Sequence, residues 1–408
     1  MTHIGVISHQ APSHIGCIAS LGRELQQRGH RFTFFNFPDT KSQVLSEGVD
    51  FSPIGESDHP LGWLKQSHEN QGKLSGISAI RFALDSLRKA QAAIFRDAPD
   101  ALKAVGVELL LVDPAVPTGG TVADFLGIPF ISVCTGMPLN REAGVPPYFT
   151  PWNYHNTWWA KLRNLWGYYW NYHNTWWAKL RNLSGYYWNY HNTWWAKLRN
   201  LWGYYLLDLL SRPVAGDIAL QRQKWKLPPY RNFNDCFSSL AQICELPAEF
   251  DFPRKALPRY FHYVGPLKTP SPQAISFPFE RLTEQPLIYA SLGTSYANQE
   301  DRQNIFHQIA EACMDLDAQL IISLGGLGQV EEFQNLPGDP LVVEYAPQLE
   351  LLAKARLTIT HAGPNTLLES LSYGVPVVSI PIATTNQHSP RVCPGLALVR
   401  LSLPSGLA

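Results

Sequence analysis

Several patterns that assign a function directly are missing from this chain of 408 residues. The six cysteines are scattered and never spaced as Cys-x-x-Cys, which argues against a disulfide framework or zinc site and for reduced thiols in the cytoplasm. No apolar run reaches the roughly 18 residues needed to cross a bilayer, and the first residues lack a signal-peptide pattern. The formal net charge is zero, so the sequence predicts no attraction to nucleic acid.

What remains is the composition of an ordinary globular protein. Hydrophobic residues make up 45% and charged residues 16% of the chain, and its length allows two domains with complete cores. The dinucleotide fingerprint Gly-x-Gly-x-x-Gly is also absent, which argues against a dehydrogenase. No cluster of residues suggests a metal site.

The chain opens with a strand, a helix and a second strand. Residues 4–8 form an apolar strand, apolar positions up to Gly29 mark the helix, and residues 31–35 form the next strand. Such a unit predicts a parallel sheet, in which ligands bind beyond the carboxyl ends of the strands. The loop after the first strand carries His9 and His14, and an imidazole can accept a proton from an alcohol near neutral pH.

The most informative stretch runs from Tyr345 to Gln387. It reads as a strand at 357–360, a Gly/Pro turn at 361–366, a helix to Ser372 and a second buried strand at 375–380. The first turn of that helix offers backbone N–H groups and the positive end of the helix dipole, which together form an anion site. An ordinary βαβ unit with a glycine-rich corner is the alternative interpretation.

Three short motifs in this stretch follow one another in a known order. Ala-Pro-Gln, His-x-Gly-x-Asn-Thr-x-x-Glu and Gly-Val-Pro together resemble the signature of the UDP-glycosyltransferase superfamily. Within it, the sequence is most similar to the bacterial branch of zeaxanthin and macrolide glycosyltransferases. The resemblance implies an α/β protein of the GT-B fold, with two Rossmann-like domains and a cleft between them. The first domain would bind an acceptor alcohol and the second a UDP-sugar.

The resemblance also implies which residues bind the donor. Tyr345 would stack on the base and Gln348 would contact the nucleoside, the turn at 361–366 would hold the diphosphate, and Glu369 would bind the ribose. A second glycine turn, after the strand at 287–290, would approach the diphosphate as well. Where the family usually has an Asp-Gln pair that holds sugar hydroxyls, this chain has Thr385-Asn386-Gln387. The implied donor residues are Gly293, Thr294, Tyr345, Gln348, His361, Gly363, Asn365, Thr366, Glu369, Asn386 and Gln387.

For catalysis, the resemblance implies a histidine base in the first loop and an aspartate that orients it. His14 is the predicted base, with His9 as the rival position. Asp113 follows the buried strand at 109–112 and is the predicted partner of His14. A helix-capping or turn role for Asp113 is the alternative, and Asp124 is the second choice.

An 18-residue segment occurs three times in the middle of the chain. The copies start at Trp152, Trp170 and Trp188 and differ only at Ser184, where the other copies have Trp. Since 18 residues are five helical turns, each copy presents the same Trp/Tyr/Leu arc opposite an Asn/Lys/Arg arc. A basic helix with an aromatic face predicts peripheral membrane contact through 152–205. For a single copy we favour packing on its own domain, and the repeated glycines are expected to break the helix.

The domain boundaries follow from composition and from the resemblance. We expect an acceptor-binding domain at 1–266, a Pro/Ser-rich linker at 267–280 and a nucleotide-sugar-binding domain at 281–408. The last part departs from the family, because residues 395–402 read like a relative's segment translated one base out of phase. The second domain is therefore expected to be truncated and incomplete.

These observations predict a transferase. It would move a hexose from a UDP-sugar to the hydroxyl of an apolar small molecule, such as a carotenoid, sterol or macrolide, with inversion and without a cofactor or metal. Two alternatives stay open at this point. One is an inactive truncated remnant that only binds a nucleotide-sugar or a membrane surface, and the other is a sugar epimerase of the same fold.

Overall fold

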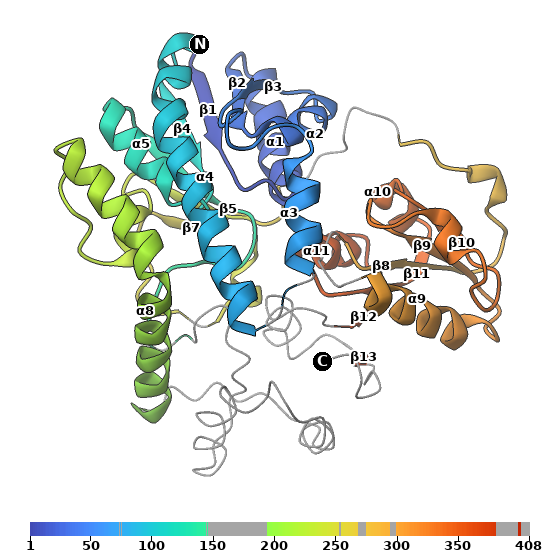
Figure 1. Cartoon of the computed structure of the whole chain (residues 1–408). Helices are drawn as coiled ribbons and strands as arrows, with labels where there is room; N and C mark the ends of the chain where they lie inside the picture. Colours follow the sequence, from blue (N-terminus) through green and yellow to red (C-terminus); the bar gives the residue numbers. More distant parts are fainter. Residues whose placement is uncertain are drawn as a thin grey trace. The chain divides into compact units, whose positions relative to one another are not determined.

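The chain divides into two compact units (Figure 1). A computed structural model describes residues 1–72, 74, 76–143, 145, 194–252, 254–267, 275–293, 299–380 and 399–400. Unit 1 comprises Met1–Val145 and Asn200–Ala274, and unit 2 comprises Pro146–Arg199 and Ile275–Ala408. The first two copies of the repeat, and the predicted donor residues Thr294, Asn386 and Gln387, lie outside the described residues.

Unit 1 contains a sheet whose strands all run parallel, in the order β3-β2-β1-β4-β5-β6-β7. The strands are β1 (His3–Ile7), β2 (Arg31–Asn36), β3 (Asp50–Pro53), β4 (Leu109–Val112), β5 (Phe130–Cys134), β6 (Gln242–Cys244) and β7 (Phe261–Tyr263). The helices are α1 (Pro12–Gln27), α2 (Lys41–Ser46), α3 (Trp63–Gly72), α4 (Gly76–Val105), α5 (Thr118–Leu126) and α8 (Trp194–Lys224), whose first residues fall in unit 2.

Successive side chains along the strands of unit 1 enter two different cores. Val6 packs with Ile15 and Ile18 of α1, whereas the next residue, Ile7, shares a core with Leu102 of α4. This follows because neighbouring side chains of a strand point to opposite faces of the sheet. Helices therefore cover both faces, as a parallel sheet requires (Figure 1).

Unit 2 repeats this architecture with parallel strands in the order β10-β9-β8-β11-β12-β13. Ala290 shares a core with Ile309 of α9, and the adjacent Tyr289 packs on the other face with Leu351 of α10. The strands are β8 (Leu287–Ser291), β9 (Gln319–Ser323), β10 (Leu341–Val343), β11 (Ala355–Thr360), β12 (Val377–Ser379) and β13 (Val399–Arg400). The helices are α9 (Gln299–Cys313), α10 (Gln348–Leu352) and α11 (Pro364–Ser372).

The prediction of two Rossmann-like α/β domains is confirmed. The strand expected at 109–112 is β4, and the helix expected to end at Ser372 is α11, which begins at Pro364. In the stretch where a frameshifted ending was expected, Val399 and Arg400 pair in parallel with Val378 and Ser379 of β12.

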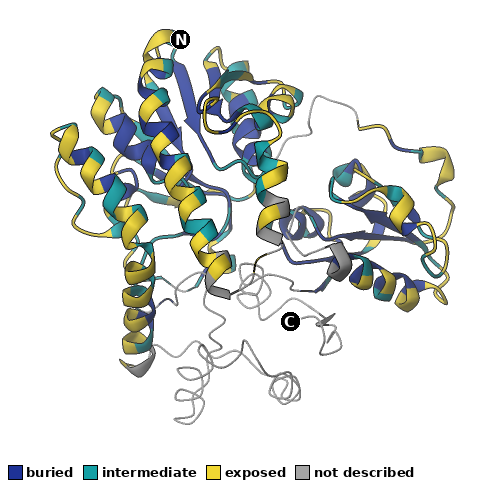
Figure 2. Ribbon diagram, in the orientation of Figure 1, coloured by how far each residue is buried: buried dark blue, intermediate teal, exposed yellow. Residues whose placement is uncertain are grey.

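The end of the third repeat copy lies in α8, and its orientation corrects the packing that we favoured for a single copy. Trp194 and Trp202 are 59% and 61% exposed, whereas Asn200 of the polar arc is fully buried and donates to the carbonyl of Ala143 at 3.0 Å. The apolar arc therefore faces outward here (Figure 2). The helix also continues through Gly203 without a break. Among the described residues, no helix combines the length and apolarity needed to cross a membrane.

A glycine of α1 is required by the close approach of the helix to β2. A Cβ atom on Gly22 would lie 2.3 Å from the Phe32 ring, which is fully buried, so Gly22→Ala must displace core atoms. We expect Gly22→Ala to lower the free energy of unfolding by about 1–3 kcal/mol, through overpacking. The shift of the urea midpoint, followed by circular dichroism, measures this loss.

The same substitution in an open part of the helix is the matched control. The nearest atom to a Cβ on Gly16 is Glu47 Oε1 at 3.5 Å, so Gly16→Ala meets no clash. It should raise the free energy of unfolding by up to about 1 kcal/mol, because alanine favours the helix. Equal midpoints for the two variants would contradict the packing argument.

Candidate active site

Both sheets have a point at which the strand order reverses. In unit 1, β1 lies between β2 and β4, and in unit 2, β8 lies between β9 and β11. Ligands of open parallel sheets bind in the crevice outside the carboxyl ends of the strands at such a point. His14 and Asp113 follow β1 and β4, and Gly293 and His361 follow β8 and β11. The predicted catalytic and diphosphate residues thus stand at corresponding places in the two units.

In unit 1, His14 and Asp113 form a close pair. His14 lies in the first turn of α1, and its Nδ1 is 2.6 Å from Oδ2 of Asp113. The Asp113 side chain is 2% exposed and the His14 side chain 27% exposed. The carboxylate also accepts backbone N–H groups from His9 at 3.2 Å and Ala115 at 2.9 Å. These donors fix the carboxylate, and the carboxylate fixes the imidazole.

Burial and charge act on this pair in opposite directions. Burial by itself lowers the pKa of His14, but the charge and hydrogen bond of Asp113, together with the charge of Glu245, raise that pKa above its ordinary value. Burial by itself raises the pKa of Asp113, but the charge and hydrogen bond of His14 bring that pKa below its ordinary value. The carboxylate is therefore ionised at neutral pH.

His9, the rival candidate for the base, and Asp124, the second choice for its partner, make other contacts. Nδ1 of His9 accepts the backbone N–H of Ala11 at 3.1 Å, and its ring lies 5.1 Å from that of His14 between centroids. Asp124 pairs with Nη1 of Arg222 at 2.7 Å, on α5 and away from His14. His14 therefore pairs with Asp113 and not with Asp124. Asp113 also makes the turn contact considered as the alternative, since it accepts the N–H of Ala115 two residues on, but it does not cap α5.

Two further residues near His14 were missed from the sequence. Thr135 directly follows β5, and its Oγ1 lies 2.7 Å from Nδ1 of His14. Glu245 directly follows β6, is 1% exposed and accepts the thiol of Cys17 at 2.9 Å. Both occupy the carboxyl end of a parallel strand, so the rule that selected Asp113 would have found them if it had been applied to β5 and β6.

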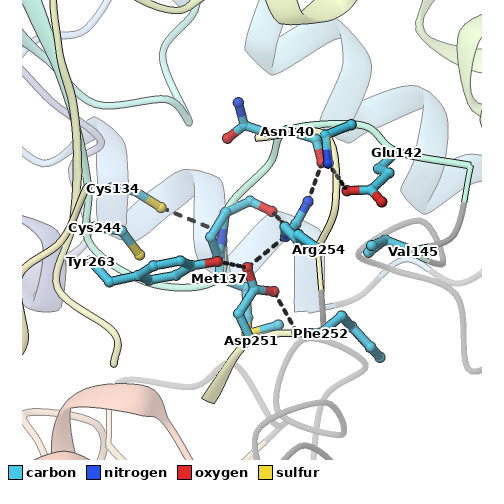
Figure 3. A network of polar contacts seen from close by, with 12 residues as sticks. Cys134, Met137, Asn140, Glu142, Val145, Cys244, Asp251, Phe252, Arg254 and Tyr263 are labelled. Atoms are coloured by element: carbon cyan, nitrogen blue, oxygen red, sulfur yellow. Dashed lines mark hydrogen bonds and ion pairs between the residues drawn. The ribbon is translucent and has the colours of Figure 1, made fainter. Parts of the chain in front are cut away.

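The loop that follows Thr135 is held by a buried ion pair (Figure 3). Nε of Arg254 is 2.5 Å from Asp251, and its Nη atoms donate to the carbonyls of Pro138 and Asn140 at 2.8 and 2.6 Å. The Tyr263 hydroxyl donates to the same carboxylate at 2.6 Å. The network thus ties residues 138–140, which follow Thr135, to the buried ion pair. Removing one partner of that pair would leave an uncompensated buried charge.

In unit 2, two glycines make room for one imidazole. A Cβ on Gly293 would lie 2.5 Å from Cε1 of His361, and a Cβ on Gly363 would lie 2.5 Å from its Nε2. A Cβ on Gly325 would lie 2.6 Å from the carbonyl oxygen of Gly293. The turns after β8, β9 and β11 are therefore in direct contact, and only glycine permits this approach.

The imidazole of His361 is uncharged at neutral pH. Burial, assisted by the charge of Arg302, lowers its pKa to about 4, although a hydrogen bond with the backbone of Ser291 acts in the other direction. If His361 contacts a phosphate in this state, it does so as a neutral donor. A charge-assisted contact with a phosphate would require the protonated ring and is not available to it at neutral pH.

The first turn of α11 directly follows this imidazole. Pro364 occupies the first helical position and has no N–H, so the backbone donors at the helix start belong to Asn365 and Thr366. Ala362 has a φ of +65°, a left-handed conformation that costs a residue with a Cβ about 1–2 kcal/mol. Such strain persists only where the surroundings impose it, and it clusters at functional sites.

The predicted nucleoside and ribose residues also lie together. Nε2 of Gln348 donates to Glu369 at 2.5 Å, and its Oε1 accepts the Tyr289 hydroxyl at 3.0 Å. Tyr345 is half-exposed, and its phenol lies where a Cβ on Gly326 would be. Among the described residues, no three His, Cys, Asp or Glu side chains are grouped so as to hold a metal ion.

Comparison with known proteins identifies the family. The profile described as UDP-glucoronosyl and UDP-glucosyl transferase matches residues 229–391. A zeaxanthin glucosyltransferase of Pantoea ananas is 33% identical over 387 residues, which cover 94% of this chain and 80% of that protein. The chain belongs to the UDP-glucosyltransferase family. A second zeaxanthin glucosyltransferase, from Pseudescherichia vulneris, is 31% identical over 94% of this chain and 82% of its own length.

Solved structures agree on the fold. A glycosyltransferase of kitacinnamycin superposes with a TM-score of 0.65 and 17% identity, covering 98% of this chain and 86% of that one. The glycosyltransferase VinC, solved in complex with DTDP, superposes with a TM-score of 0.61 and 15% identity, covering 99% and 88%. The fold of this chain is therefore GT-B. Its glycosyltransferase activity with a nucleotide-sugar donor follows from the family.

The electrostatics of the His14 pair give a measurable prediction. In the intact chain, the pKa of His14 should lie above 6.5, its ordinary value, so the imidazole loses its proton only as the pH rises through that higher pKa. Asp113→Asn removes the main opposing charge, so burial dominates and the pKa should fall below 6.5. Glu245→Gln should lower it by less. NMR titration of ¹⁵N-labelled histidine measures each value.

Asp124→Asn is the matched control for this titration. It removes a carboxylate of the same unit that pairs with Arg222 and not with His14. The pKa of His14 should stay unchanged in this variant. A fall as large as that in Asp113→Asn would mean that net charge, and not the direct contact, sets the pKa.

Proposed function

We propose that this chain transfers a hexose from a UDP-sugar to the hydroxyl of an apolar small molecule, with inversion at the anomeric carbon. The observation that carries the proposal is the 2.6 Å contact between His14 and the buried carboxylate of Asp113. With Nδ1–H directed to Asp113, Nε2 of the neutral imidazole is the free base of the pair. Asp113 orients the ring and offsets the charge that develops on it.

The proposed reaction is a single displacement. Nε2 of His14 takes the proton of the acceptor hydroxyl as its oxygen forms a bond to the anomeric carbon. The bond between that carbon and the diphosphate oxygen breaks, and the electron pair leaves with UDP. Attack from the face opposite the leaving group inverts the configuration, and a general base of this kind contributes about 10²–10⁴-fold to the rate.

The donor is proposed to bind at the carboxyl ends of the strands of unit 2. The diphosphate would lie against the N-terminus of α11, near Asn365 and Thr366, where backbone N–H groups and the helix dipole favour an anion. The close contact of the His361 ring with Gly293 and Gly363 supports this placement, because two turns without side chains leave room for a phosphate to approach. Thr294 would join that turn, and Asn386 and Gln387 would contact the sugar.

The nucleoside would occupy the neighbouring positions. Gln348 and Glu369 are proposed to bind the nucleoside and ribose, and the half-exposed ring of Tyr345 to stack on the base. The hydrogen bond between Gln348 and Glu369 supports a shared site, because each holds the other in place. UDP rather than another nucleotide is proposed from the family.

The acceptor is proposed to be an apolar alcohol, such as a carotenoid, sterol or macrolide. Two relatives that match 94% of this chain are named zeaxanthin glucosyltransferases. The outward apolar arc of α8 supports a peripheral contact with a membrane, from which such an acceptor would come. Leu198, Leu201 and Tyr205 extend this arc and are each about half-exposed, and Lys197 is exposed beside it.

The proposal is tested by separating turnover from donor binding. His14→Ala should reduce glucosyl transfer from UDP-glucose to zeaxanthin in detergent micelles by about 10²–10⁴-fold and leave UDP binding intact. Gly293→Ala should weaken UDP binding by about tenfold or more, measured by calorimetry, because its Cβ would meet His361 at 2.5 Å. NMR of the glucoside reports the configuration of the product.

The control for donor binding is Gly374→Ala. Gly374 has a φ of +69°, as Gly293 has +58°, but nothing lies within 4 Å of its Cβ position. This variant carries the same backbone strain without the clash and should bind UDP like the unchanged chain. Undiminished transfer by His14→Ala would move the base elsewhere, and a product of retained configuration would exclude the single displacement.

The membrane contact has its own test. Binding to vesicles with anionic lipid should weaken with salt and fall by about tenfold in Trp202→Ser, since burial of a large apolar side chain is lost. Leu220→Ser is the control, because Leu220 is 58% exposed on the same helix but lies outside the arc of the repeat. Equal vesicle binding by both variants would show that the apolar arc of α8 is not the surface that contacts the membrane.

A further inference from the structure

Nδ1 of His14 faces two oxygen atoms and not one. Oδ2 of Asp113 lies at 2.6 Å and Oγ1 of Thr135 at 2.7 Å. Thr135 is 6% exposed. Among the described residues, its hydroxyl forms one hydrogen bond, and that bond is the contact with His14. The chain after Thr135 is fixed by Arg254 through the carbonyls of Pro138 and Asn140.

These two oxygens differ in what they can offer. An ionised carboxylate only accepts hydrogen bonds, whereas a hydroxyl can both accept and donate. A neutral imidazole carries its proton on Nδ1 or on Nε2. Beside the Asp113 carboxylate, a bare Nδ1 would place its lone pair against a negative charge. The proton therefore stays on Nδ1, which donates to Asp113 and shares the hydrogen with Oγ1 of Thr135.

The preference reverses when the carboxylate is removed. Nδ1 is then free to accept the hydroxyl hydrogen of Thr135, and the imidazole proton moves to Nε2. In that tautomer Nε2 cannot take a proton from an alcohol. The same hydroxyl thus supports the base while Asp113 is present and opposes it when Asp113 is absent.

We propose that Thr135 is a positioning residue that acts on the tautomer of His14, with a sign that Asp113 determines. The inference rests on the proposed role of His14 as the base. It also gives Asp113 a second role. By keeping the proton on Nδ1 of His14, the carboxylate prevents the hydroxyl of Thr135 from donating a hydrogen bond to that nitrogen. Thr135 itself touches neither donor nor acceptor in this proposal.

A double-mutant cycle tests the sign. With Asp113 intact, Thr135→Val should lower kcat for transfer from UDP-glucose to zeaxanthin about threefold to tenfold, the value of one hydrogen bond, with little change in KM. In the Asp113→Ala background, where activity is already low, Thr135→Val should raise kcat severalfold. Thr135→Ser retains the hydroxyl and should match threonine in both backgrounds.

A second measurement reads the tautomer without any substrate. In ¹⁵N-histidine NMR, the signal that His14→Ala removes identifies His14. It should show a protonated Nδ1 in the unchanged chain, a protonated Nε2 in Asp113→Ala, and more protonated Nδ1 again in Asp113→Ala/Thr135→Val. This result stands even if another group proves to be the base, so failure of the proposed function and failure of this inference are distinguishable.

The matched control is Thr118→Val. Thr118 is fully buried in the same unit, and its hydroxyl has no hydrogen-bond partner among the described residues. This variant should change neither kcat nor the tautomer of His14. An equal loss from Thr135→Val in both backgrounds, no effect in either, or a rise in KM alone would overturn the proposal.

Discussion

The parallel direction of every strand pair in the described part of the chain is the constraint on which the rest of this structure depends. Because all carboxyl ends lie at one edge of each sheet, residues as far apart in the sequence as His14, Asp113 and Thr135 meet after β1, β4 and β5. The same geometry joins the turns after β8, β9 and β11 in unit 2. Helices on both faces bury the strands and leave that edge as the place where polar side chains and turns gather.

The two sites use a histidine under opposite electrostatic conditions. The His361 ring is buried and the His14 ring is partly buried, and burial alone lowers a histidine pKa. At His14 the carboxylates of Asp113 and Glu245 reverse that effect, whereas at His361 the charge of Arg302 adds to it. One histidine is thus suited to gain a proton from an alcohol. His361 is a neutral ring, and the glycines on both sides of it leave the space that the ring occupies.

The outward arc of α8 shows how a polar contact can set the orientation of an aromatic helix. Asn200 and Tyr204 donate to the carbonyls of Ala143 and Val145, and these bonds hold the polar side of the helix inward. Trp194 and Trp202 then remain exposed on the opposite side. A helical pattern alone does not reveal this choice, because either face of an amphipathic helix satisfies the same period.

The sequence alone determined the alternation of strands and helices, the family and the glycine-rich turn before α11, since hydrophobic period, turn residues and motif order are local properties. It also placed His14 and Asp113 at strand ends, although only the register of β1 and β4 brings the two within hydrogen-bond distance. The tertiary structure decided the rest. Thr135 and Glu245 stand directly after strands, as Asp113 does, but only the pairing that places β5 and β6 in the same sheet brings them to His14. The direction in which each histidine pKa is shifted was likewise decided by neighbours distant in sequence, because an ionisation equilibrium depends on burial and nearby charge, which no local pattern contains.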